Sequence, residues 1–232
     1  MAATLVVAAG VQGLIGLGLG LVAAPVVALV APELMPEFML WLGLMMPFVT
    51  LVREHHEIDW RGLGLSIPAR IVGTALGVAL VAAIPTAGLG VAVGLMVLLS
   101  VLLTARAVEI AVTPVTLSAA GFLSGVAGTA TSVGGPPMAI LYQHRPPRQI
   151  RSTLGLFFIV GAGMSLAGLA LAGRAELTTF LLALTMVPAL VLGFALSRLV
   201  DRRIPRHHIR TGVLVVSALS AVAALVRSLL TL

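Results

Sequence analysis

The feature that most constrains this chain is its series of long apolar runs, which short polar connections separate. A helical span of the bilayer core requires about 20 apolar residues, and backbone polar groups in lipid must pair within the protein. The connections are too short to fold as a separate soluble domain. The sequence therefore predicts an all-α polytopic membrane protein and not a soluble enzyme. The apolar runs are Leu5–Val30, Leu40–Val52, Leu63–Ile84, Gly90–Thr104, Leu154–Ala172, Leu177–Leu199 and Gly212–Leu225.

Composition leads to the same fold class and excludes several functions. Charged residues make up 9% of the 232-residue chain, whereas soluble domains carry about 25%. All 14 basic residues are arginines, and most lie in the connections, as the positive-inside rule expects. The net charge of +6 therefore does not predict a nucleic-acid partner. The absence of cysteine excludes disulfides and cysteine-based metal sites, and we expect no cofactor and no metal.

The two halves of the chain resemble each other in the positions of glycine and proline. These residues determine backbone shape, so matched positions predict a shared structure. We place the two membrane repeats at residues 1–108 and 109–232, as parts of one integral membrane unit. The matched pairs are Gly13 with Gly125, Pro25 with Pro137 and Gly43 with Gly155 at a shift of 112 residues, and Pro68 with Pro188 at a shift of 120 residues.

The arginine bias of equivalent connections is reversed between the halves, which predicts repeats of inverted topology. Inversion requires an odd number of crossings per half, so one segment of each half must not cross. We expect the glycine-rich segments around residues 4–30 and 114–143 to form re-entrant or broken hairpins, with six full spans besides. The cytoplasmic side would carry residues 53–61, 145–151 and 198–210. Eight plain spans with a weak charge bias are the alternative.

The segment from Gly121 to Pro137 concentrates the residues that favour an anion site. Its glycines permit close backbone approach, and Thr129, Thr131 and Ser132 add hydroxyl donors at membrane mid-depth. Irregular backbone at that depth is tolerated where it lines a cavity. A half-helix beginning at the prolines would direct its positive dipole end into that cavity. The alternative is glycine-mediated helix packing, with the hydroxyls bonded back to their own chain.

Candidate binding residues come from both glycine-rich segments and from one intramembrane arginine. The first-half segment keeps the glycines but lacks hydroxyls, and Gln12 there is equivalent to Ser124. Arg70 lies within an apolar run, where a charged residue indicates function by default. Snorkelling of Arg70 to the interface is the alternative. The candidate substrate-binding residues are Thr129, Thr131, Ser132, Gly128, Gly134, Gly135, Gln12, Gly16, Gly18, Ser124 and Arg70.

Two motifs carry a resemblance to a known family: GVAGTATSVGGPP at residues 125–137 and RSTLGLFF at residues 151–158. With the glycine-rich segment near each start, they make the whole chain similar to the sulfite exporter TauE/SafE family of permeases. The resemblance implies a secondary transporter of sulfite, organosulfonates or related anions in the plasma membrane. It implies a small anionic substrate and alternating access at a mid-membrane site, with H⁺ or Na⁺ as candidate coupling ions. A homodimer stays open.

Two further functions remain as alternatives. An anion channel would share the site but would lack saturable, gated exchange. A membrane-embedded enzyme would require a Ser–His or metal-ligand constellation within the apolar runs. The five histidines lie in connections or at the ends of runs, which argues against an enzyme.

Overall fold

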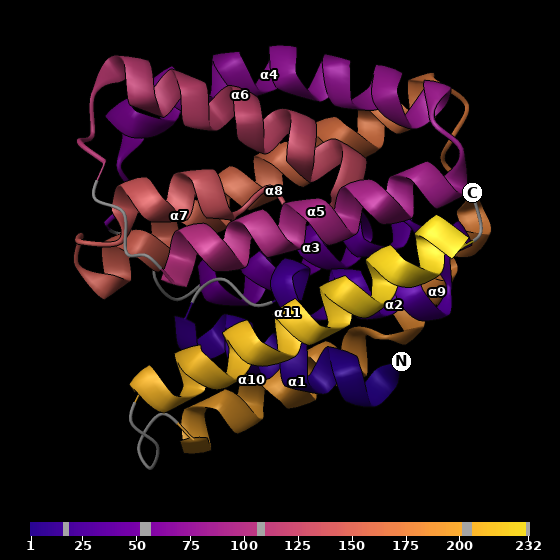
Figure 1. The fold of residues 1–232 in the computed structure, drawn as a ribbon. Helices are drawn as coiled ribbons and strands as arrows, with labels where there is room; N and C mark the ends of the chain where they lie inside the picture. The colour runs from indigo at the N-terminus through magenta and orange to yellow at the C-terminus, as the bar shows by residue number, and fades with distance from the viewer. Residues whose placement is uncertain (16–18, 52–56, 106–109, 201–205, 231–232) are drawn as a thin grey trace.

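The computed structural model describes residues 1–15, 19–51, 57–105, 110–200 and 206–230 (Figure 1). Within these residues all regular secondary structure is helical, which confirms the predicted fold class at that level. The elements are α1 (Ala2–Ile15), η1 (Leu19–Ala23, a π-helix), α2 (Ala24–Val30), η2 (Pro32–Leu34, a 3₁₀-helix), α3 (Glu37–Leu51), α4 (Trp60–Ala83), α5 (Thr86–Ala105), α6 (Pro114–Thr131), α7 (Pro136–Tyr142), α8 (Pro147–Leu171), α9 (Leu177–Thr185), α10 (Val187–Val200) and α11 (Arg206–Leu230).

Four helical segments among the described residues are long and apolar enough to cross a membrane. They are Trp60–Ala83, Pro147–Leu171, Leu177–Ser197, which joins α9 to α10, and Gly212–Leu230. The apolar parts of α3 and α5, Glu37–Phe48 and Gly88–Leu103, are shorter than these. The chain is therefore a helical protein with several candidate spans, and the number of six full spans stays a prediction.

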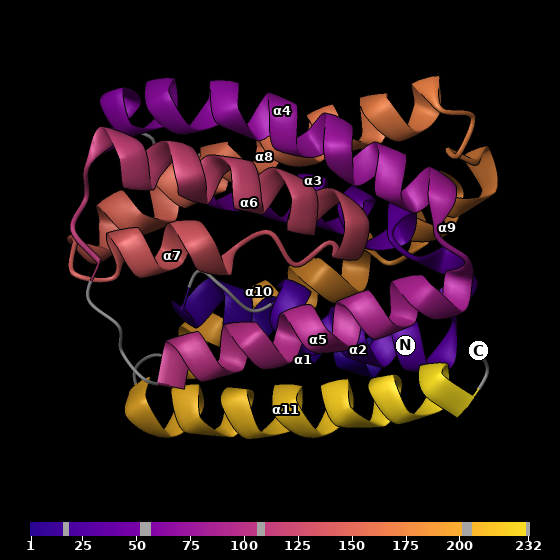
Figure 2. The same ribbon diagram turned by 45° about the horizontal axis from the view of Figure 1, so that its top comes forward.

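Helices from opposite halves of the chain pack against each other along much of their length. The pairs are α4 with α6, α1 with α10, α3 with α8, and α5 with α11 (Figures 1 and 2). Glycines make the closest of these crossings possible, because a Cβ on Gly73 would overlap the carbonyl oxygen of Phe122. In the same way, a Cβ on Gly193 would overlap the carbonyl oxygen of Val6 in α1. Small residues at these crossings let the backbones approach as packing in lipid requires.

The segment formed by α6 and α7 leaves one end of the molecule and returns to the same end (Figure 2). The side chain of Thr113 caps the start of α6 by accepting from the Thr116 N–H, and the Thr116 side chain in turn accepts from the Thr113 N–H. Ser132 ends the helix in the left-handed conformation, at φ 60°. A non-helical stretch then leads to the two prolines that open α7. The chain through α1, η1 and α2 lies beside α10 and α11. The predicted site residues Gly16 and Gly18 of this first segment lie outside the described residues.

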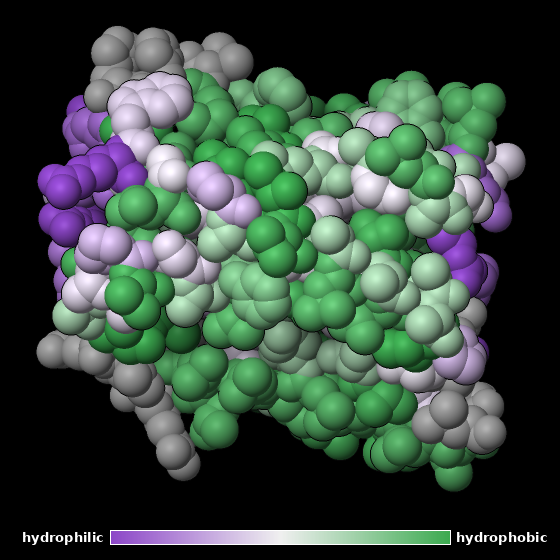
Figure 3. Space-filling model, turned by 90° about the horizontal axis from the view of Figure 1, so that it is seen from above, coloured by the Kyte–Doolittle hydropathy of each residue, from purple (hydrophilic) through white to green (hydrophobic). Residues whose placement is uncertain are grey.

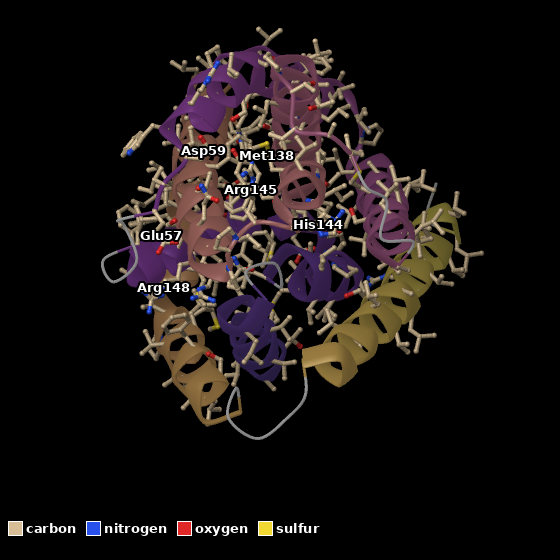
Figure 4. All side chains as sticks on the ribbon, turned by 90° about the vertical axis from the view of Figure 1, so that its left-hand side faces the viewer. Glu57, Asp59, Met138, His144, Arg145 and Arg148 are labelled. Atoms are coloured by element: carbon tan, nitrogen blue, oxygen red, sulfur yellow. The ribbon has the colours of Figure 1, made fainter. Side chains whose placement is uncertain are left out.

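The two ends of the molecule differ in charge. We call the end that holds the starts of α4, α6 and α8 the arginine-rich end. Figure 4 looks onto it and shows Glu57, Asp59, His144, Arg145 and Arg148 around the helix ends. The opposite end, which we call the acidic end, holds the connections 31–36 and 172–176. Its charged residues with described side chains include Glu33, Glu37, Arg174 and Glu176. Among predicted cytoplasmic residues, Arg53, Arg202 and Arg203 lie outside the described residues.

Between these ends, apolar side chains cover the surface. Val72 in α4, Leu95 in α5 and Leu219 in α11 are 62%, 57% and 68% exposed. Figure 3 shows hydrophobic residues across the middle of one face, with hydrophilic residues gathered toward its two sides. Such a surface is unfavourable in water and is suited to lipid. The fully buried core includes Phe38, Tyr142 and Phe157.

Candidate functional site

A cavity of about 80 Å³ lies where the two glycine-rich segments meet. This volume has room for several water molecules or for one small oxyanion. A Cβ on Gly20 would stand 3.0 Å from the carbonyl oxygen of Ser132, so the two segments are in close contact beside it. The lining residues are Gln12, Leu19, Gly20, Leu21, Met39, Leu40, Gly43, Met46, Pro47, Arg70, Gly128, Ser132, Val133, Gly134, Gly135, Pro136, Phe158 and Ala162.

Arg70 is the single charged residue of this lining, and it is only 3% exposed. Its Nη1 donates a hydrogen bond of 3.4 Å to the carbonyl oxygen of Phe157. Its guanidinium carbon lies 4.2 Å from the centre of the Phe157 ring, within the range of a cation–π contact. Its Nε has no hydrogen-bond partner in the described part of the structure. The hydrogen-bonding capacity of Arg70 is therefore not fully used within the protein, and its side chain is buried and does not reach the surface as snorkelling would require.

Glycine creates the space that the guanidinium occupies. A Cβ on Gly161 of α8 would overlap the guanidinium carbon, Nε and Nη2 of Arg70. A Cβ on Gly128 of α6 would stand 3.3 Å from Nη2. The guanidinium is thus seated between two helices of the second half, although Arg70 itself belongs to α4 of the first half.

Ser132 and the residues after it form the wall from the second glycine-rich segment. The Ser132 hydroxyl donates to the carbonyl oxygen of Pro36 at 2.8 Å, which ties this wall to the start of α3. The Ser124 hydroxyl donates to the carbonyl oxygen of Gly134 at 2.5 Å and holds the non-helical stretch against α6. A Cβ on Gly134 would stand 2.8 Å from the Cα of Gly128, so this approach also depends on glycine.

The structure brings together some of the predicted site residues and separates others. Three predicted hydroxyl residues, Ser124, Thr129 and Thr131, are buried but do not line the cavity. The Thr129 hydroxyl is bonded to that of Ser165 at 2.8 Å, and the Thr131 hydroxyl donates to the carbonyl oxygen of Ala127 at 2.7 Å. The Thr131 contact is a bond back to its own helix, as the packing alternative described, whereas the Thr129 contact joins α6 to the side chain of Ser165 in α8. The predicted residues that line the cavity are Gln12, Arg70, Gly128, Ser132, Gly134 and Gly135.

The start of α7 faces the cavity, as the half-helix hypothesis requires, but its donors differ from those expected. Pro136 and Pro137 open this seven-residue helix and carry no N–H group. Gly134 and Gly135, which line the cavity ahead of the helix, do carry backbone N–H groups.

Sequence reasoning missed the contributions of α3 and α8. Met39 and Met46 of α3 and Phe158 of α8 line the cavity, and Phe157 with Gly161 orients Arg70. The motif RSTLGLFF contains both phenylalanines, so it was a signal for this wall. No comparable pattern distinguishes Met39 or Met46 from other methionines of the chain.

Each end of the molecule has a polar contact that joins the two halves. At the arginine-rich end the Tyr142 hydroxyl donates to the Asp59 carboxylate at 2.8 Å, and the Asp59 N–H donates to the Thr153 hydroxyl at 3.0 Å. At the acidic end the buried Glu37 carboxylate accepts from the Glu176 N–H at 3.1 Å and from the Trp41 indole N–H at 3.1 Å. Burial, and then the hydrogen bond to Asp59, raise the pKa of Tyr142, so that the phenol remains a neutral donor.

Comparison with protein families gives one match, to the family described as "Sulfite exporter TauE/SafE", over residues 1–224. This match spans nearly all of the 232-residue chain, so the chain belongs to the sulfite exporter TauE/SafE family. Membership implies a membrane exporter or permease for sulfite or related sulfur compounds. No curated protein and no solved structure matches the chain.

Proposed function

We propose, with this family membership as the premise, that the protein is a secondary transporter of a small sulfur-containing oxyanion, such as sulfite or an organosulfonate. The substrate would bind in the cavity beside Arg70. One observation carries the assignment of the site: the guanidinium of Arg70 is buried at the cavity with an unpartnered Nε. The choice of a sulfur compound rests on the family and not on the geometry.

The electrostatics of the cavity support an anionic ligand. A buried cation is costly unless an opposite charge or a set of hydrogen-bond acceptors compensates it. The described residues of the lining include no carboxylate, and among them Arg70 is balanced by a carbonyl oxygen and the face of an aromatic ring. A bound oxyanion would supply the missing charge and would accept charge-assisted hydrogen bonds.

Inverted repeats are supported by the pairing of helices across the halves. The second glycine-rich segment packs on a span of the first half, as α6 on α4, and the first packs on a span of the second half, as α1 on α10. The connection 31–36 lies at the acidic end, and the equivalent connection 143–146 lies at the arginine-rich end (Figure 4). By the positive-inside rule, the arginine-rich end would face the cytoplasm of a plasma-membrane protein.

Alternating access is supported by the contacts that close the two ends. Tyr142 with Asp59 would hold the arginine-rich end, while Glu37 with Glu176, and Ser132 with Pro36, would hold the acidic end. Each contact joins segments from different halves, so rocking of one half against the other would break the contacts at one end while keeping those at the other. H⁺ or Na⁺ would be the coupling ion. The proposal applies to a single copy of the chain and equally to a homodimer.

Uptake of radiolabelled sulfite into proteoliposomes containing the full chain tests this function. Saturable uptake with counterflow is the expected result, and Arg70→Gln should reduce uptake about 10- to 100-fold through loss of charge-assisted bonds. Arg61→Gln is the matched control, since Arg61 lies on the same helix but is exposed and outside the cavity. Uptake that never saturates would favour the channel. No uptake of any sulfur oxyanion, or equal loss in both variants, would refute the proposal.

A further inference from the structure

The single positive charge that Arg70 brings to the cavity limits the charge of the ligand that the cavity can bind. Arg70 contributes the single formal charge of the lining, and the other polar side chains there, Gln12 and Ser132, are neutral. We infer that the site selects singly charged anions over doubly charged ones. This inference rests on the proposed function, because it concerns the same cavity, and it adds the charge state of the substrate.

Among the residues with described side chains, no second cation lies at the cavity to balance a dianion. The residues whose side chains are described include six other arginines, and none of them lines the cavity. Five of the six are exposed and the sixth, Arg151, is half-buried. These residues are Arg61, Arg145, Arg148, Arg151, Arg174 and Arg227.

The guanidinium of Arg70 brings one positive charge to the cavity. Its Nη1 is engaged by the carbonyl oxygen of Phe157, its Nε is buried without a hydrogen-bond partner, and its Nη2 lies near Gly128 of the cavity wall. One guanidinium neutralises one negative charge of an oxyanion in contact with it. The ring of Phe157 lies against this guanidinium, and Gly161 leaves the space that it occupies.

The neutral polar groups of the lining are already used in part by the protein. The Ser132 hydroxyl donates its proton to the carbonyl oxygen of Pro36, and Gln12 Oε1 accepts from the Leu19 N–H at 3.1 Å. The remaining wall is rich in apolar side chains, such as Met39, Met46 and Phe158. A second negative charge would therefore be desolvated without an ionic partner, whereas one negative charge is neutralised by Arg70.

Binding of three ligands to the purified full chain tests the inference. Methanesulfonate is singly charged and sulfate is doubly charged throughout the mildly acidic to mildly alkaline range, while sulfite gains its second charge within that range. Methanesulfonate should bind about a hundredfold more tightly than sulfate, since an unpaired buried charge is costly. Sulfite affinity should fall as the pH rises, while methanesulfonate affinity, measured at the same pH values, corrects for titration of the protein.

A change of the cavity charge provides a second test. Gln12→Lys adds a cation to the lining and should raise the affinity for sulfate relative to methanesulfonate, while Gln12→Met, of similar length and neutral, should leave the ratio unchanged. Both variants lose the bond to the Leu19 N–H, so the comparison isolates charge.

The outcomes separate this inference from the proposed function. Equal affinities for sulfate and methanesulfonate, or a sulfite affinity that rises with pH, would overturn the charge selection while leaving an anion transporter. The same holds if the ratio does not change in Gln12→Lys. Failure of every anion to bind, with Arg70→Gln indistinguishable from the original chain, would instead overturn the proposed function and this inference with it.

Discussion

Replacement of Gly161 by alanine should displace the guanidinium of Arg70 from its seat. The added methyl group would overlap the guanidinium carbon, Nε and Nη2, so either Arg70 or helix α8 must move. Gly163, two residues further along the same helix, has no other atom within 4 Å of its Cβ position. Gly163→Ala is therefore a matched control in which the same methyl group enters open space.

The magnitude can be worked from these contacts. In both variants the helix gains about 1 kcal/mol from alanine in place of glycine. In Gly161→Ala, overpacking costs about 1–3 kcal/mol and loss of the Arg70–Phe157 hydrogen bond about 1.5–3 kcal/mol. We therefore expect Gly161→Ala to be less stable than Gly163→Ala by about 2.5–6 kcal/mol if both costs apply fully, and by less if the helix shifts.

Thermal unfolding in detergent and binding of a monovalent sulfonate are the two measurements. Gly161→Ala should unfold at a lower temperature than Gly163→Ala, and its affinity should fall tenfold or more, which corresponds to about 1.4 kcal/mol of lost ligand interaction. A Gly161→Ala protein that matches its control in both measurements would refute the assigned position of Arg70. Lower stability with unchanged affinity would show that Arg70 does not bind the ligand.

Two further predictions concern the ends of the molecule. Glu33→Cys and Pro147→Cys, both at exposed positions, should react with an impermeant thiol reagent from opposite sides of a sealed membrane, and labelling from the same side would contradict the inverted topology. Tyr142 is the single tyrosine of the chain, so a tyrosinate absorbance titration reads it alone. Because its pKa is raised in the folded protein, tyrosinate should appear only above pH of about 10. The stability that Tyr142 contributes as a neutral donor should be complete below that pH and lost above it, and Asp59→Asn should lower the apparent pKa toward its ordinary value.

Several features of this protein could be predicted from the sequence because they depend on local composition. Runs of about 20 apolar residues predict membrane helices wherever they occur. Gly134 and Gly135 before two prolines predict an interruption of helix, and the structure has no helix between Ser132 and Pro136. Arg70 in an apolar run was a functional candidate because a charge in lipid is costly. These three residues line one cavity, and their part in binding stays a prediction.

The orientation of side chains could not be predicted in the same way. Thr129, Thr131 and Ser132 are close in sequence and similar in chemistry, yet only Ser132 lines the cavity. The hydroxyl of Thr129 contacts Ser165 on α8, and that of Thr131 bonds within α6. In a soluble helix an apolar stripe identifies the buried face. Here α4 and α11 carry apolar side chains on their exposed side as well as on their packed side. Hydropathy therefore does not identify which side of each helix is buried.

The sequence by itself therefore determined that this protein belongs in a membrane and is helical. It also identified the glycine- and proline-rich segment that interrupts a helix, and Arg70 as a charged residue within an apolar run. Only the tertiary structure decided that Gly161 and Phe157 of the second half orient Arg70 of the first, and that Asp59 meets Tyr142. Hydropathy is a local property of consecutive residues. The contacts that build the cavity join residues more than 80 positions apart, such as Arg70 and Phe157, and they arise only when the two halves pack together.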